Sequence, residues 1–253
     1  AWSWRAGRRP TARTSGPSLL APWSVVWAAS TPRGVELEIT DEQKRRFLLS
    51  FDAPRHPRLA TGAELVATLL LHALGYHVPE RHLVLFEPGQ IRAGKATRRR
   101  RPDGRERTSD RPLGTRGLRA LLAPLPRLED GSLRAVATRL DGATDLGPFR
   151  YRGRRADDPN DRVRHERRRE LRGLGPVAAF LNLTGITLEV PRDRYLRRKP
   201  RHVRHYLWHL RGALGSTSRG RPKPLWEGRA PLYSVQRILQ QALTLGLVRS
   251  MPT

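Results

Sequence analysis

Short runs of alternating apolar and polar residues open the ordered part of the chain. They cover residues 23–29, 35–39 and 47–51, and turn-forming or polar residues separate them. A period of two is typical of strands that bury one face, and the Pro and Gly between the first two runs favour a tight connection. The pattern therefore predicts an antiparallel meander of three strands.

The clearest helical pattern follows at residues 62–74. Leucines recur there at intervals of three and four residues, so they fall on one side of a helix. Thr61 and Glu64 have the T-x-x-E spacing of a capping box, and Gly75 stands where a helix would end. The sequence predicts one amphipathic helix after the meander.

The pattern is mixed between this helix and residue 145. Residues 82–87 and 133–140 favour strands, and residues 118–123 favour a short helix that two prolines stop. Residues 91–112 have no period and include four consecutive arginines, which predicts a solvated basic loop. A basic arm for nucleic acid or phospholipid is the alternative interpretation of that loop.

The second half opens with a polar turn and a helix. Residues 157–161, with two aspartates before a proline, form the turn, and apolar residues at helical spacing run from Leu171 to Leu181. Pro176 interrupts this helix, so we expect a kink there or a new helix that starts at Pro176. Residues 203–208 favour a strand that leads into a glycine loop. A last helix is predicted from Ser234 onward.

Charge is the most unusual feature of the composition. The 253 residues include 49 Lys and Arg against 23 Asp and Glu, and only four of the basic residues are lysines. Arginine in such excess fits selection for phosphate or carboxylate binding, and it fits equally the codon usage of a GC-rich genome. The arginines are spread along the chain, which favours the codon explanation. In either case we expect non-specific binding of polyanions such as nucleic acid at low salt.

The length fits one large domain or two lobes, after a basic tail at residues 1–21 that we expect to be disordered. Cysteine is absent, which excludes disulfides and thiolate metal sites, and no apolar run is long enough to span a membrane. The chain begins at Ala1 rather than Met, so a truncated N-terminus is one interpretation. We read residues 23–29 as a strand rather than as part of a signal peptide, and we expect a cytoplasmic rather than a secreted protein. The sequence indicates no oligomeric state.

Several phrases of the sequence resemble a bacterial family of uncharacterised proteins related to HipA-like and phosphatidylinositol-kinase-like folds. The phrases that carry the resemblance are residues 51–86, 146–173, 177–182, 203–207 and 213–216. The resemblance implies an α+β, two-lobed, protein-kinase-like fold. Its N-terminal lobe, an antiparallel sheet with one helix, would cover residues 22–145, and a mostly helical C-terminal lobe would cover residues 146–253. It also implies ATP and Mg²⁺ as cofactors.

The same resemblance assigns the kinase positions to particular residues. A kinase uses a strand Lys held by a helix Glu, a catalytic Asp, and an Asn and an Asp that bind Mg²⁺. The helix Glu is Glu64, but the Lys position falls at Ser50, the catalytic Asp position at Gly185 and the metal Asp position at His209. Asn182 lies in the phrase that matches the catalytic loop. Three replaced parts predict a degenerate kinase-like domain without phosphotransferase activity.

Two alternatives stay open at this point. Asp158 and Asp161 supply substitute metal ligands if the protein is an active kinase, although such a group is more often a turn that caps the following helix. A sequence-independent nucleic-acid or polyanion-binding protein is the other alternative. The histidines at 202, 205 and 209 fit a metal site less well than ordinary polar positions, because arginines lie among them. We therefore expect no metal site there.

Overall fold

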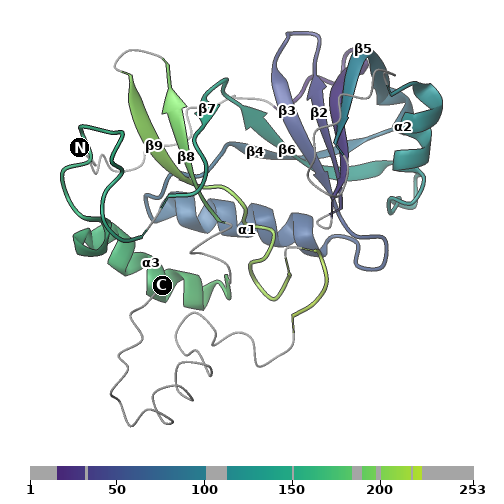
Figure 1. The fold of residues 1–253 in the computed structure, drawn as a ribbon. Coiled ribbons are helices and arrows are strands. Elements are labelled where there is room, and N and C mark those ends of the chain that lie inside the picture. Colours follow the sequence, from purple (N-terminus) through teal and green to yellow (C-terminus); the bar gives the residue numbers. More distant parts are fainter. Residues whose placement is uncertain are drawn as a thin grey trace.

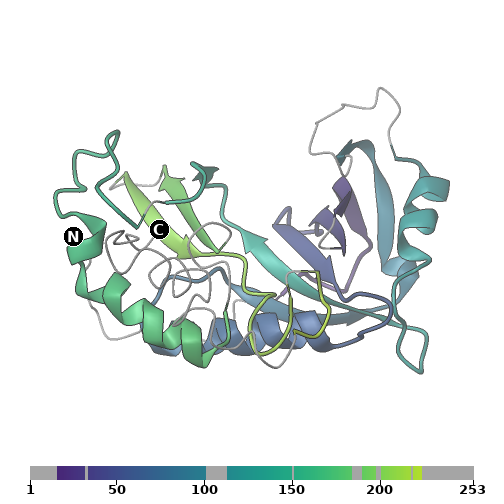
Figure 2. The ribbon, with the colours of Figure 1, turned by 60° about the horizontal axis from the view of Figure 1, so that its bottom comes forward.

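The computed structural model describes residues 16–31, 34–100, 113–149, 151–183, 190–197, 201–217 and 219–223, with the backbone alone for Thr31 and residues 95–100. Within these ranges the chain forms a mixed sheet of six strands, an antiparallel sheet of three strands and three α-helices (Figure 1). The expected α+β class is therefore confirmed. Figure 2 shows the two sheets on opposite sides of the molecule, with one long helix beneath both.

The predicted meander forms the centre of the larger sheet. Strands β1 (Trp23–Thr31), β2 (Gly34–Thr40) and β3 (Arg46–Phe51) pair antiparallel in sequence order. The alternation places one set of side chains of each strand in a common apolar core, which includes Trp23 and Phe51 packed around Phe86. Burial of these aromatic rings with the aliphatic residues of the same core stabilises this half of the chain.

Two further predicted strands extend the sheet beyond β3. Strand β6 (Leu133–Leu140) pairs antiparallel with β3, and β4 (Arg81–Phe86) pairs antiparallel with β6 at the sheet edge. The complete order is β4-β6-β3-β2-β1-β5. β6 comes after β4 in the chain yet inserts between β4 and β3, so these pairings are long-range.

The segment expected to be a basic loop at residues 91–112 is in part a strand. β5 (Ile91–Arg100) pairs parallel with β1 at the other edge of the sheet, which corrects the prediction for residues 91–100. Pairing with β1 satisfies backbone groups on one side of β5, and an edge strand tolerates charged residues that a central strand does not. Residues 101–112 lie outside the described residues. The short helix predicted next is confirmed as α2 (Thr115–Leu122), which buries three leucines in the same core.

Helix α1 (Leu59–Ala73) confirms the predicted amphipathic helix but not its predicted cap. The helix begins two residues before Thr61, and its first turn has no side-chain cap of its own. Instead the Asp52 carboxylate, from the end of β3, accepts hydrogen bonds from the Thr61 N–H (2.9 Å) and the Thr61 hydroxyl (2.6 Å). Glu64 is buried rather than turned back to the helix start. The capping box prediction is therefore wrong, and a carboxylate from the preceding strand takes its place.

The described part of the second half contains more strand than expected. It has one α-helix, α3 (Arg169–Phe180), and a sheet of β7 (Thr144–Asp145), β8 (Pro191–Leu196) and β9 (His202–Leu207). The expectation of a mostly helical second half is thus wrong for these residues. The helix predicted from Ser234 lies outside the described residues.

Helix α3 continues through Pro176 from Arg169 to Phe180. The alternative of a new helix that starts at Pro176 is therefore wrong. Pro176 removes one N–H from the helix, and the carbonyl that loses its partner belongs to Arg172, an exposed residue whose backbone water can satisfy.

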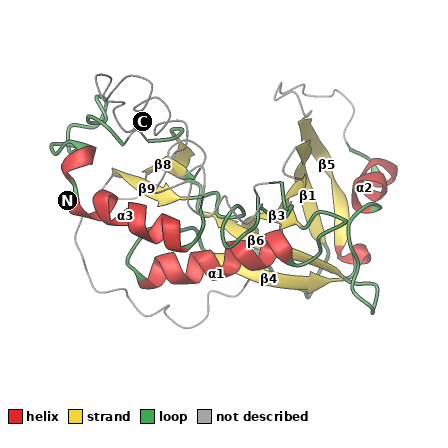
Figure 3. Cartoon of the chain, turned by 90° about the horizontal axis from the view of Figure 1, so that it is seen from below, coloured by secondary structure: helices red, strands yellow, loops and turns green. Residues whose placement is uncertain are grey.

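Helix α1 also joins the two halves of the chain. Its Ala67 and Leu71 belong to a second apolar cluster with Leu174 and Ala178 of α3. Figure 3 shows α1 and α3 side by side, while α2 lies apart at the β5 edge. A hydrogen bond from the Tyr76 hydroxyl, just after α1, to the Glu170 carbonyl of α3 (2.9 Å) strengthens this contact.

The helices are short by the standard of membrane proteins. α1 has 15 residues, whereas a helical span needs about 20 apolar ones. No helix in the described ranges is long and apolar enough to cross a membrane.

Asp52 should be important for the stability of the α1 start. The change Asp52→Ala removes the acceptor of the Thr61 N–H and the ion-pair partner of Arg134 (3.1 Å), and we expect it to lower the free energy of unfolding by about 3 kcal/mol. Urea denaturation measures this loss. Glu129→Ala, which changes an exposed carboxylate, is the matched control and should leave the midpoint nearly unchanged. An equal shift in both variants would contradict the role of Asp52.

Candidate functional site

Ser50 and Glu64, two residues singled out in the sequence, lie in contact. Leu49 and Phe51 face the apolar core, so Ser50 between them points to the other face of the sheet, which α1 covers. The Ser50 hydroxyl donates a hydrogen bond to Glu64 Oε2 (3.2 Å), and both residues are buried. The two positions that the resemblance assigns to the strand Lys and the helix Glu are therefore neighbours in the fold.

Arg81 of β4 supplies the positive charge beside Glu64. Its Nε lies 3.1 Å from Glu64 Oε1, and the two side chains are only 1% and 6% exposed. Nη1 donates to the Thr68 hydroxyl (2.9 Å), and Nη2 donates to the Trp208 carbonyl. Burial lowers the pKa of Arg81 from its ordinary value, and Glu64 opposes this shift. Arginine stays protonated in proteins, so this is a buried ion pair.

Sequence reasoning missed Arg81 because the predicted strand began one residue later, at His82. The signal was nonetheless present. A period of two from Leu85 and Leu83 places Arg81 on the same face of β4, away from the apolar core. A charged residue in that series indicates a polar partner across the sheet face. The partner is Glu64 of α1, and the local pattern of β4 does not identify it.

The chain after β9 connects this ion pair to the end of α3. We call residues 208–214 the linking segment. It touches the first half through the Arg81 bond to Trp208 and through Arg211 Nη2, which donates to the Phe51 carbonyl. On its other side, the Leu214 N–H donates to the Leu181 carbonyl (2.6 Å). Residues from β3, β4 and the end of α3 thus meet around one short segment.

Asn182 and His209 both belong to this region. Asn182 has a left-handed backbone (φ 48°), and its carbonyl accepts a hydrogen bond from Lys223 Nζ. The same Nζ donates to the Gly212 carbonyl of the linking segment (2.5 Å). His209 lies within the linking segment, and its N–H donates to the Val190 carbonyl (3.4 Å). Gly185 lies outside the described residues.

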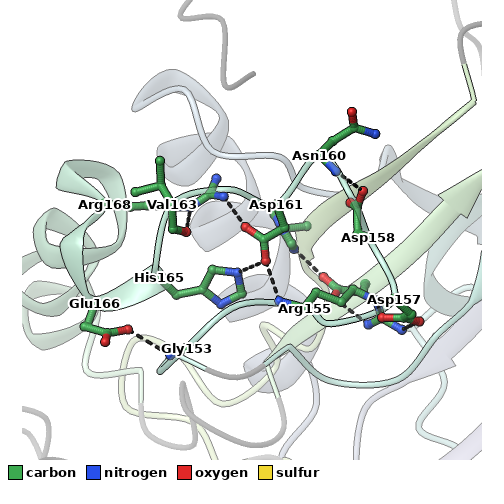
Figure 4. A network of polar contacts seen from close by, with 12 residues as sticks. Gly153, Arg155, Asp157, Asp158, Asn160, Asp161, Val163, His165, Glu166 and Arg168 are labelled. Atoms are coloured by element: carbon green, nitrogen blue, oxygen red, sulfur yellow. Dashed lines mark hydrogen bonds and ion pairs between the residues drawn. The ribbon is translucent and has the colours of Figure 1, made fainter.

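Asp158 and Asp161 lie in a separate loop (Figure 4). Asp158 Oδ1 accepts a hydrogen bond from the Asn160 N–H (2.9 Å), which is a local turn contact. The Asp161 carboxylate accepts from the Arg155 N–H (2.5 Å) and pairs with His165 Nε2 (2.8 Å) and the Arg168 guanidinium. Neither aspartate caps α3, whose first turn has no side-chain cap. Among the described residues, the bonds of these two carboxylates stay within residues 155–168.

A second buried aspartate fixes this loop to the smaller sheet. Asp193 of β8 stands opposite His205 of β9 in the strand register and pairs with His205 Nδ1. Its other oxygen accepts from Arg155 Nη1 (2.8 Å). The His165 and His205 rings stand edge to face, 5.6 Å apart. Sequence reasoning missed this group because β8, a strand rich in charged residues, was not predicted.

The described residues offer no metal centre. They contain no group of three or more His, Asp or Glu side chains that could hold an ion. His205 pairs with Asp193 in the smaller sheet. Near the linking segment, Glu64 is a carboxylate that Arg81 already neutralises. This arrangement can hold two halves of the chain together and leaves Glu64 without the free charge that a metal ion needs.

Removing one partner of the buried Arg81–Glu64 ion pair should cost more stability than removing both partners. Arg81→Met leaves Glu64 charged and buried, and we expect a loss of about 3 kcal/mol in the free energy of unfolding. The double change Arg81→Met with Glu64→Met removes both charges and should recover a large part of that loss. Chemical denaturation of the three proteins measures how much of the loss the double change recovers. If the double variant is no more stable than Arg81→Met, the unpaired charge of Glu64 is not the main cause of the lost stability.

Asp161 should make stability depend on pH in the acid range. Burial by itself would raise the pKa of Asp161, but the Arg155 N–H and the neighbouring His165 and Arg168 outweigh it and lower that pKa below its ordinary value of 3.8. A lowered pKa stabilises the folded state above the ordinary value, and this contribution disappears as pH falls through the folded-state pKa. Asp161→Asn should therefore cost about 2 kcal/mol at pH 6 and flatten the pH dependence below pH 4.

Urea denaturation at several pH values between 6 and 2 tests this expectation. Asp158→Asn is the matched control, because Asn keeps the acceptor of the local turn. It should leave both the stability at pH 6 and its acid dependence unchanged. Parallel curves for wild type and Asp161→Asn would show that Asp161 is not the titrating group.

Comparison with known proteins adds no relative to this picture. No protein-family model, no curated protein and no solved structure matches the chain. The contacts around the linking segment therefore carry the functional argument by themselves.

Proposed function

We propose that the chain is a kinase-like domain that does not transfer phosphoryl groups. The observation that carries the proposal is the set of partners of Glu64. In protein kinases a lysine on the third strand binds the nucleotide phosphates, and a glutamate on the following helix holds that lysine. Here the third strand offers the Ser50 hydroxyl to Glu64, and a cation from another strand, Arg81, neutralises it.

The replacement of the lysine has a direct chemical consequence. A serine hydroxyl carries no charge to offset phosphate oxygens. Arg81 cannot serve instead, because Glu64, Thr68 and the Trp208 carbonyl already engage its guanidinium. The Glu64 position thus acts as a structural ion pair between α1, β4 and the linking segment.

The other kinase positions favour the same conclusion. The catalytic Asp position is Gly185, and the metal Asp position is His209, so neither offers a carboxylate. Magnesium prefers oxygen ligands, and phosphoryl transfer depends on charge compensation by such groups. Loss of these parts typically costs orders of magnitude each in rate.

The kinase-like reading is supported by the meeting of distant segments. By resemblance, residues 181–185 correspond to a catalytic loop and residues 209–211 to a metal-binding loop, which lie beside each other in a kinase. Leu214 binds Leu181, and Lys223 bridges Asn182 and Gly212. Arg211 connects the same segment to the end of β3. These contacts are the ones expected between two lobes that share such a centre.

Polyanion binding is a second candidate, which exposed arginines near the start of α3 favour. The exposed members are Arg162, Arg164, Arg167, Arg169 and Arg172. Glu166 pairs with Arg164 (2.7 Å), so it neutralises only part of this charge. A surface of this kind attracts phosphate backbones without sequence preference, and salt weakens that attraction.

Thermal denaturation with nucleotide separates these functions. In about 0.5 M salt, which screens non-specific attraction, we expect the same melting temperature with and without Mg-ATP, because the metal and lysine positions are lost. At low salt, tripolyphosphate and Mg-ATP should both stabilise the protein through its surface charge. A direct assay should find no ATP turnover above a buffer blank.

Two experimental results would contradict the proposed loss of phosphoryl transfer. Magnesium-dependent ATP turnover that Asp158→Asn or Asp161→Asn abolishes would show an active kinase with substituted ligands. A melt that rises with Mg-ATP but not with tripolyphosphate at high salt would show a surviving Mg-nucleotide site. Either result would overturn the proposal of a domain without catalytic metal chemistry.

A further inference from the structure

Helix α1 has an apolar side that the described chain leaves exposed. Among its fifteen residues the only Asp, Glu, Lys or Arg is Glu64, which is buried. Its outward side therefore carries no such charge, although charged residues make up 28% of the chain. We call this side the outer face of α1. It consists of Gly62, Leu65, Val66, Leu69, Leu70 and Ala73.

The outer face is unlike the solvent side of an ordinary surface helix. Leu69 is 68% exposed, and Val66 and Leu70 are 45% and 38% exposed. A surface helix normally turns polar side chains towards water, whereas a helix that is apolar all round is normally buried on every side. The described residues bury the opposite side of α1, which includes Ala67 and Leu71. The outer face thus matches a partner that is itself apolar.

Strand β4 exposes leucines on the same side of the larger sheet. Leu83 and Leu85 alternate with the buried Val84 and Phe86, so they point to the side of the sheet that α1 covers. Leu83 is 48% exposed and Leu85 is 49% exposed. β4 is an edge strand in contact with α1, and Figure 3 shows the two side by side. Exposed apolar side chains gathered in this way usually mark an interaction site.

The sequence contains a segment that matches this surface. Residues 234–246 lie outside the described residues, and their pattern predicts an amphipathic helix that begins at Ser234. A helix of this length is marginally stable by itself, so it needs an apolar surface to pack against. The residues that fall on its apolar side are Val235, Ile238, Leu239, Ala242 and Leu243.

The chain leaves the described residues close to α1. A Cβ atom built on Gly220 would lie 3.4 Å from the Cβ of Ala60, so Gly220 packs against the start of α1. Three residues later, the Lys223 N–H donates to the Gly215 carbonyl (2.7 Å). Residues 224–233 then connect Lys223 to Ser234. An extended connection of this length spans about 35 Å, whereas α1 is about 22 Å long, so the segment reaches every part of the outer face.

We propose that residues 234–246 form a helix that docks on the outer face of α1, with its apolar side against Val66, Leu69 and Leu70. The short connection makes the docking intramolecular, at an effective concentration of about millimolar. A second copy of the chain is a weaker candidate, because the formal net charge of +26 opposes self-association. Since α1 joins the two halves of the chain, the docked helix would brace the same junction.

Cross-linking of the full chain tests the docking. The chain has no cysteine, so a pair of thiols introduced by substitution reacts alone. In the variant with Leu69→Cys and Leu239→Cys, a short bismaleimide should join the two thiols within one molecule. We expect this reaction to be roughly tenfold faster than in the control pairs, because docking raises the local thiol concentration. Mass spectrometry of the digested product identifies the joined peptides.

Two control pairs define the expected geometry. Leu69→Cys with Gln240→Cys moves the second thiol to the polar side of the predicted helix. Glu129→Cys with Leu239→Cys moves the first thiol to an exposed position before β6. Both pairs should react slowly within one molecule.

Amide hydrogen exchange is a second measurement that needs no cysteine. In the wild type, residues 235–245 should exchange roughly tenfold or more slowly than an unstructured chain, because a docked helix protects its N–H groups. Leu69→Glu puts a charge on the outer face and should remove this protection. Leu69 is exposed, so α1 itself should keep its protection in this variant. Glu129→Ala is the control and should leave the exchange unchanged.

Four results would overturn the docking. Unprotected exchange of residues 235–245 in the wild type would show that no docked helix forms. Cross-linked dimers in place of the intramolecular product would show that a second copy covers the outer face. Equal rates for the Leu239→Cys and Gln240→Cys pairs would show that neither side of the segment is turned to α1. Protection that survives Leu69→Glu would place the helix elsewhere. None of these measurements depends on ATP turnover, so they are independent of the proposed loss of phosphoryl transfer.

Discussion

The fold depends on the pairing of buried carboxylates with arginines. In a chain with 49 basic and 23 acidic residues, an arginine that enters the interior needs one of a limited number of acids. Glu64 pairs with Arg81, Asp52 with Arg134, Asp161 with Arg168 and Asp193 with Arg155. Each of these pairs connects separate elements or fixes a loop. Breaking such a pair costs more than forming it gains, because the remaining charge stays buried.

The pairing of Glu64 with Arg81 bears directly on the proposed function. In the proposed kinase-like arrangement, Glu64 would occupy the position from which a kinase glutamate holds a catalytic lysine. Because Arg81 is the partner of Glu64, the carboxylate attaches β4 and the linking segment to α1. A lysine introduced by Ser50→Lys would compete with Arg81 for the same Glu64 oxygens.

Much of the fold followed from local patterns, and the rest depended on distant partners. The alternation in β1 to β4 and β6 and the leucine spacing in α1 reflect burial of one face, which a sequence displays directly. β5 and β8 are rich in arginine, and their strand character comes from backbone pairing with β1 and β9. In the site, Ser50 and Glu64 came from a resemblance. Arg81, Asp193 and Arg211 could not be assigned, because their partners lie far away in sequence.

Arg211 is a buried arginine that has no carboxylate partner among the described residues. Arg194 is buried to a similar degree and has Asp141 at 2.9 Å. Arg211 has a backbone carbonyl and two unmatched donors, in a region where the neighbouring acids are already engaged. Among the described residues, Arg211 therefore departs from the pairing with a carboxylate that Arg81, Arg134, Arg155 and Arg168 show.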